Sequence, residues 1–92
     1  MYTITHTHAQ MSALLNQSAN AEIQLTSKIA DLLSSRSAAV SFIQTTQLQS
    51  VVNSNQRSIY AMDLQLTQAR KELDVAQYNY YYASKQLATL NN

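Results

Sequence analysis

The stretch of sequence that decides the fold is residues 45–90, TTQLQSVVNSNQRSIYAMDLQLTQARKELDVAQYNYYYASKQLATL. Its apolar residues recur alternately three and four positions apart, which places them along one face of an α-helix. We call this face the seam, and its predicted core members are Leu48, Val52, Ile59, Met62, Leu66, Ala69, Leu73, Ala76, Tyr80, Ala83, Leu87 and Leu90. Only another helix can bury a seam of this length, so the pattern predicts helix–helix packing.

Three successive steps of the seam are small residues, Ala69, Ala76 and Ala83. Alternation of small and large side chains lets two helix backbones approach more closely than layers of leucine would. A larger side chain at Ala76 is therefore expected to overpack the seam, at a cost of about 1–3 kcal/mol.

The first half of the chain predicts a second helix that can cover this seam. Residues 10–43 repeat apolar residues at threes and fours, although Ser18, Glu22 and Arg36 lie on or beside the stripe. The stems of the charged residues are expected to cover apolar surface; alternatively, the charges pair across a subunit contact and fix its register.

The absence of Gly and Pro from all 92 residues also favours helix, because turns of sheets and long loops depend on these residues. We therefore expect an all-α fold, a long antiparallel helical hairpin similar to a coiled coil, formed by residues 10–92. Its turn is expected at residues 34–37 (Ser-Ser-Arg-Ser) or 53–55 (Asn-Ser-Asn), since Asn and Ser tolerate unusual backbone angles. One continuous helix is the alternative.

Residues 1–9 are expected to form an extended or disordered N-terminal arm. The alternation of Tyr, Ile and His with Thr over residues 2–8 also fits an edge strand or a swapped arm.

The second helix carries apolar residues on the side away from the seam. We call this side the second face, and its members are Tyr60, Leu64, Val75, Tyr78 and Tyr82. A hairpin needs one apolar stripe per helix, so a second stripe predicts a further partner. Tyr is favoured at protein interfaces because its ring buries area while its hydroxyl keeps a polar contact. The partner is expected to be another copy of the chain or another helical protein.

The sequence lacks the residues that nucleic-acid binding, catalysis, phosphate binding and metal binding would require. The net charge is +1 and 12% of residues are charged, so no basic groove for nucleic acid is expected. The carboxylates show no pairing with His, Ser or Lys that would support catalysis, and no Gly-rich loop could hold a phosphate group. His6 and His8 are the only His residues and the chain has no Cys, so neither a metal site nor a cofactor is expected. The pattern likewise predicts no catalytic residue and no small-molecule substrate.

No run of residues approaches the ~18 apolar residues of a membrane span. The N-terminus lacks both the basic region and the continuous apolar region of a classical signal peptide.

The residues at 9–20, Ala-Gln-Met-Ser-Ala-Leu-Leu-Asn-Gln-Ser-Ala-Asn, and the seam at 59–90 resemble the small helical subunits exported by flagellar and type III secretion systems. The abundance of Gln, Ser, Asn and Thr and the absence of Cys and Trp are similar too. Needle, rod and filament subunits of these systems build tubes from packed helices, so the resemblance implies self-assembly in bacterial secretion. Residues 72–90 also resemble the coiled hairpins of outer-membrane efflux channels, which are several times longer.

We therefore expect a non-enzymatic structural protein that self-assembles into a filament, tube or bundle. The alternative is a small helical chaperone or adaptor that forms a discrete dimer or heterodimer with one partner. The resemblance implies a secreted or cell-surface protein without a classical signal peptide; a cytoplasmic location is the alternative.

Overall fold

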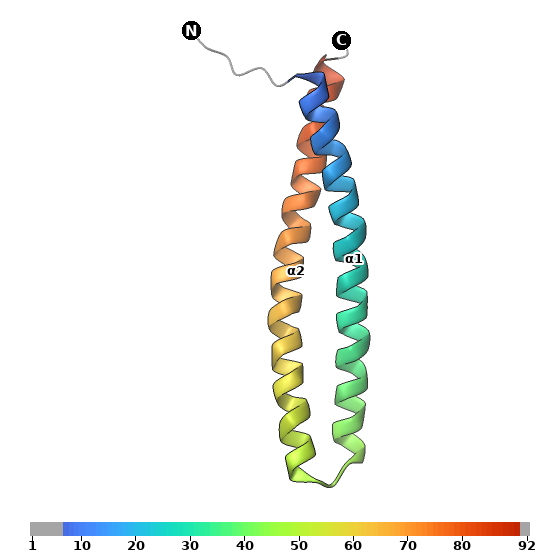
Figure 1. The fold of residues 1–92 in the computed structure, drawn as a ribbon, viewed down its shortest axis with the longest axis vertical. Helices are drawn as coiled ribbons and strands as arrows, with labels where there is room; N and C mark the ends of the chain where they lie inside the picture. Colours follow the sequence, from blue (N-terminus) through green and yellow to red (C-terminus); the bar gives the residue numbers. More distant parts are fainter. Residues whose placement is uncertain (1–6, 91–92) are drawn as a thin grey trace.

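The computed structural model describes residues 7–90, which form two helices and a short connection (Figure 1). Helix α1 spans His8–Thr45 and helix α2 spans Gln49–Leu90. The helices run antiparallel, so the start of α1 and the end of α2 lie at one end of a molecule with principal extents of 68 × 23 × 14 Å. The expectation of an all-α helical hairpin is confirmed, and the alternative of one continuous helix is wrong.

Helix α1 begins with a reciprocal capping box. The Thr7 hydroxyl accepts a hydrogen bond from the Gln10 backbone N–H at 3.1 Å, and the Gln10 side chain accepts one from the Thr7 N–H at 2.9 Å. These bonds satisfy two backbone donors that the first turn would leave unpaired. The predicted boundary of the N-terminal arm is therefore wrong for residues 7–9, which cap or enter the helix. The rest of the predicted arm, residues 1–6, lies outside the described residues.

The turn lies at residues 46–48, and both predicted turn positions are wrong because they fall inside helices. Thr46 leaves α1 in an extended conformation (φ −96°, ψ 146°), and its N–H still donates to the Phe42 carbonyl oxygen at 3.1 Å. The Leu48 N–H donates to Thr46 Oγ1 at 3.4 Å. No residue in the described part of the chain has a positive φ. The turn therefore needs neither Gly nor the left-handed backbone that singled out Asn.

The polar residues of the rejected turn find hydrogen bonds within α2. Asn55 Nδ2 donates to the Val51 carbonyl oxygen at 2.9 Å, and Asn53 Oδ1 accepts from Gln49 Nε2 at 3.0 Å. Such bonds to residues one helical turn away let Asn remain in a helix that tertiary packing stabilises.

The seam of α2 faces α1 over most of its length. Leu66, Ala69, Ala76 and Ala83 are buried, and the half-buried members are Val52, Ile59, Met62, Leu73 and Leu87. Ala69 and Ala83 have 0% of their surface exposed, as expected where two helices approach closely.

Three predicted members of the seam are exposed. Leu48 is 64% exposed because it belongs to the turn rather than to α2. Tyr80 is 41% exposed, since its ring is too large for the narrow space between helices beside Ala76 and Ala83 and extends to the rim. Leu90 is also 41% exposed because it is the last residue of α2, at the open end of the hairpin. The seam prediction is wrong at these positions.

Helix α1 supplies a matching stripe with polar members. The stripe consists of buried and half-buried positions that recur alternately four and three residues apart: Met11, Leu15, Ser18, Glu22, Leu25, Ile29, Leu32, Arg36, Ala39 and Ile43. Arg36 Nε donates to Asp63 Oδ1 on α2 at 2.7 Å. A pair this exposed contributes little stability, about 0–1 kcal/mol, but it marks one register of the two helices. Arg36 therefore pairs within its own chain, and the alternative of pairing across a subunit contact stays a prediction.

Replacing Leu48 with Asp is expected to stabilise the hairpin by about 1 kcal/mol. The Leu48 carbonyl oxygen accepts the first helical hydrogen bonds, from the N–H groups of Val51 and Val52 at 3.1 and 3.0 Å. Leu48 thus occupies the N-cap position of α2, where a carboxylate can accept from an unpaired backbone N–H and interact favourably with the helix dipole. Thermal and urea unfolding followed by circular dichroism measures the change.

Leu48→Ala is the matched control, since it removes the same side chain without adding a cap. It should change stability by a few tenths of a kcal/mol at most. A clear loss of stability in both variants would place Leu48 in the buried seam and contradict the observed turn.

Candidate functional site

The second face predicted on α2 is open to solvent. Tyr60, Leu64, Val75 and Tyr78 are 68%, 56%, 59% and 66% exposed, while Tyr82 is half-buried. Large apolar side chains at this level of exposure over one helix are typical of a surface that binds another protein.

The structure divides the second face into two parts. Tyr60 and Leu64 lie one helical turn apart, but eleven residues, about 16 Å along the helix, separate Leu64 from Val75. The face is therefore not one continuous stripe. Its part nearer the chain ends is the larger one, because three of the five predicted residues lie there.

This part forms what we call the tyrosine patch, Val75, Tyr78, Tyr81 and Tyr82. The rings of Tyr78 and Tyr82 stack with centroids 6.5 Å apart and planes inclined by 13°. The Lys85 ammonium lies 5.5 Å from the centroid of the Tyr81 ring, within the range of a cation–π interaction. These contacts hold the rings in place before any partner binds, so a partner would lose less side-chain entropy in ordering them.

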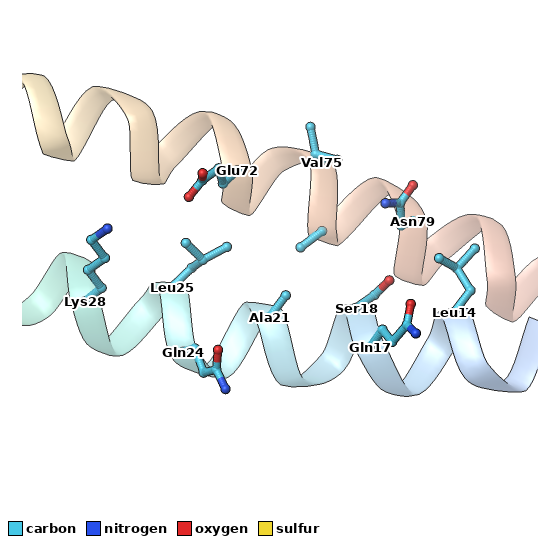
Figure 2. Close-up of a pocket in the computed structure, with 11 residues that line it drawn as sticks. Leu14, Gln17, Ser18, Ala21, Gln24, Leu25, Lys28, Glu72, Val75 and Asn79 are labelled. Atoms are coloured by element: carbon cyan, nitrogen blue, oxygen red, sulfur yellow. The ribbon is translucent and has the colours of Figure 1, made fainter.

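A groove of about 550 Å³ runs between α1 and α2 beside the tyrosine patch (Figure 2). Small side chains create it: Ser18 and Ala21 on α1 lie at the level of Ala76 on α2, where larger residues would fill the space. Leu14 and Leu25 contribute apolar surface.

Charged groups from both helices border the groove. Lys28 projects from α1 and Glu72 from α2 (Figure 2). Both side chains are exposed, and the Glu72 carboxylate accepts a hydrogen bond from Gln68 Nε2 at 3.3 Å. In the described part of the chain the single ion pair within 4 Å is Arg36–Asp63, so Lys28 and Glu72 are not paired with each other.

The floor of the groove contains the hydroxyl group of a buried residue. Ser18 is 4% exposed, and its oxygen points towards α2 (Figure 2). No hydrogen bond within the described residues involves this hydroxyl, and no side-chain oxygen among them is both fully buried and unpaired, so the oxygen remains accessible from the groove. The groove therefore offers a hydroxyl group that a docking partner can reach.

Sequence reasoning identified the tyrosines but not the groove. The small residues that form the groove come from both helices, and they meet only when the register of the hairpin is known. Ser18 falls on the α1 stripe and Ala76 on the seam of α2, so small residues on both stripes were the available signal.

The described residues provide little for metal or membrane chemistry. His6 lies outside them, and His8 Nδ1 lies 3.4 Å from Ser12 Oγ within the first turns of α1. Between residues 7 and 90 no three His, Cys, Asp or Glu side chains gather as a metal site would require. Neither helix, over the same residues, has a segment long and apolar enough to cross a bilayer.

Known proteins provide no template for these surfaces. No protein-family model matches the chain, and no curated protein or solved structure is significantly similar to it. Inferences about function therefore rest on the shape and chemistry of the hairpin.

Proposed function

We propose that this protein is a non-enzymatic structural subunit that self-assembles through helix–helix contacts into a filament, tube or bundle, with the tyrosine patch as an assembly surface. The observation that carries the proposal is the imbalance between a very small core and a large exposed apolar surface.

The imbalance is visible in the burial of individual residues. The buried apolar side chains in the described part of the chain are Met11, Leu66, Ala69, Ala76 and Ala83. The exposed large apolar side chains are Ile23, Leu33, Phe42, Leu48, Tyr60, Leu64, Val75, Tyr78, Tyr80, Tyr81 and Leu90. Since burial of apolar surface is the main force that stabilises a fold, a chain with so little burial gains most from association with further helices.

The total surface supports the same conclusion. The chain exposes 6898 Å². A compact monomer of 10.3 kDa would expose about 5,400 Å², so this chain exposes about 1,500 Å² more. A standard protein interface covers about 800 Å² on each partner. The excess is close to the area of about 1,600 Å² that two such interfaces would cover on one subunit, and two interfaces are the minimum for a polymer.

The resemblance to exported helical subunits gives the proposal a biological setting, as a component of a bacterial secretion system that leaves the cell without a classical signal peptide. A discrete dimer or heterodimer, as a small chaperone or adaptor would form, is the competing outcome.

Size-exclusion chromatography with light scattering, followed by negative-stain electron microscopy, tests the proposal on the full chain. Concentration-dependent growth into filaments, tubes or rings is the expected result. A monomer at all concentrations, or a dimer that does not grow when concentrated, would overturn the proposal.

Replacing Tyr78 and Tyr82 together with Ser is expected to raise the concentration needed for polymerisation at least tenfold while leaving the hairpin folded. Buried interface tyrosines contribute large contact areas, and a tenfold loss corresponds to about 1.4 kcal/mol. Light scattering measures assembly, and circular dichroism reports helix content.

Tyr60→Ser is the matched control, because Tyr60 is as exposed as Tyr78 but lies outside the tyrosine patch. Unchanged polymerisation of the Tyr78/Tyr82 variant would exclude the patch as an assembly surface. An equal loss in the Tyr60 variant would attribute the effect to general surface hydrophobicity.

A further inference from the structure

We infer that the groove between α1 and α2 docks a second copy of the same chain, forming a four-helix dimer whose two-fold axis runs parallel to the long axis of the hairpin. This inference rests on the proposed self-assembly and names the first contact in it. The dimer would be the building unit, and the tyrosine patch would join units to one another.

The direction of the axis follows from helix packing. A two-fold axis along the hairpin places α1 of one copy against α2 of the other, with both turns at the same end. Each helix then has two antiparallel neighbours, one within its own chain and one in the second copy, as in an up-and-down four-helix bundle. Antiparallel neighbours bring opposite ends of the helix dipoles together.

The charges at the rim of the groove suit this arrangement. Lys28 and Glu72 project from different helices into one groove and do not pair within the chain (Figure 2). Because the proposed axis brings α1 of each copy to α2 of the other, Lys28 of each copy approaches Glu72 of the second copy. In the dimer the rim of the groove on one copy thus meets the same rim on the second copy, with opposite charges facing each other. A two-fold symmetric interface requires such self-complementarity.

The hydroxyl of Ser18, accessible from the groove, offers a polar contact at the floor. Asn79 lines the groove at the level of Ser18 (Figure 2). In the proposed dimer, Asn79 of the second copy comes to the same level over α1, where its amide can hydrogen-bond the Ser18 hydroxyl. This contact would give the hydroxyl of a residue that is 4% exposed a protein partner in place of solvent.

The tyrosine patch stays available in this dimer. Val75, at the edge of the groove, points its side chain away from α1 (Figure 2). Tyr78 and Tyr81 are 66% and 61% exposed. Docking in the groove and contact through the tyrosines therefore use adjoining surfaces that share Val75.

The test uses two charge reversals, Lys28→Glu and Glu72→Lys, studied separately and as a 1:1 mixture of the full-length chains. The first variant makes both rim charges of the groove acidic and the second makes both basic, so each is expected to dimerise at least tenfold more weakly than the unchanged chain. In a mixed dimer the acidic rim of the Lys28→Glu chain faces the basic rim of the Glu72→Lys chain. We expect dimers of one chain of each kind to form at least as readily as the unchanged dimer. Sedimentation equilibrium measures the association, and native mass spectrometry identifies mixed dimers.

Arg70→Glu and Asp74→Lys are the controls, because they reverse exposed charges on α2 that do not line the groove. These variants should dimerise like the unchanged chain. Single groove variants that associate normally, or a mixture that associates no better than either variant alone, would overturn the groove dimer. If the unchanged chain polymerises while that happens, self-assembly stands and only the groove inference fails. A chain that is monomeric under all conditions would contradict both the proposed self-assembly and the groove dimer.

Discussion

Replacing Leu66 with Ala is expected to destabilise the hairpin by about 2–5 kcal/mol. Leu66 is 4% exposed and is the largest aliphatic side chain buried in α2. Its removal leaves a cavity that two helices held apart by their neighbouring contacts cannot close. Because a small domain has a total stability of about 5–15 kcal/mol, the loss is a large share of the whole. Urea unfolding followed by circular dichroism measures it.

Leu64→Ala is the matched control for this experiment. Leu64 lies two residues away on the same helix and undergoes the same substitution, but it is 56% exposed. Its replacement should change the free energy of unfolding by about 0.5 kcal/mol or less. Equal destabilisation by the two variants would mean that α2 is rotated relative to the position described for it.

Replacing Ala69 with Leu is expected to cost about 1–3 kcal/mol, for the opposite reason. Ala69 has 0% exposure, so a larger side chain has no free volume to enter and must push the helices apart. The expected result is a lower melting temperature with unchanged helix content at low temperature, measured by circular dichroism.

Ala76→Leu provides the contrast. Ala76 also belongs to the seam, but it lines the groove, and a leucine there can extend into open space. We therefore expect a smaller loss of stability than at Ala69, together with weaker dimerisation because the groove is partly filled. A cost at Ala76 equal to that at Ala69 would show that the groove does not accommodate the added atoms.

The hairpin architecture could be predicted from sequence because helical periodicity is a local signal. Leu66, Ala69, Ala76 and Ala83 follow one repeat, and each is buried whatever the position of the turn. The register and the neighbours of α1 depend on pairing between distant residues, such as Arg36 and Asp63, which no local pattern specifies.

The turn was not predicted because its chemistry was taken to require a left-handed residue. Thr46 instead leaves the helix with a negative φ, and its hydroxyl accepts a hydrogen bond from Leu48. A usable signal was nevertheless present in the spacing of the two stripes. Extended beyond Ile43, the α1 repeat would reach positions 50 and 53. The α2 repeat instead uses positions 52 and 55, two residues further along the chain in each case. In one continuous helix this shift of two residues would place the two stripes about 200° apart, on opposite sides.

The candidate site was predictable only in part. Exposed tyrosines could be identified because a helix of a hairpin buries a single face. The four tyrosines between positions 78 and 82 point in too many directions for all of them to lie on that face. The division of the second face, the stacking of Tyr78 on Tyr82 and the groove all depend on side-chain positions in three dimensions.

The turn also decides where this molecule can be labelled. The start of α1 and the end of α2 lie together, on the half of the hairpin that carries the groove and the tyrosine patch, whereas residues 46–48 form the opposite tip (Figure 1). A probe at the exposed Gln47 would therefore lie far from the proposed contacts. Because the chain contains no cysteine, Gln47→Cys would introduce a single thiol for a fluorophore. In the inferred dimer two such fluorophores would lie at the same end, so energy transfer between them could follow the pairing of two chains in solution.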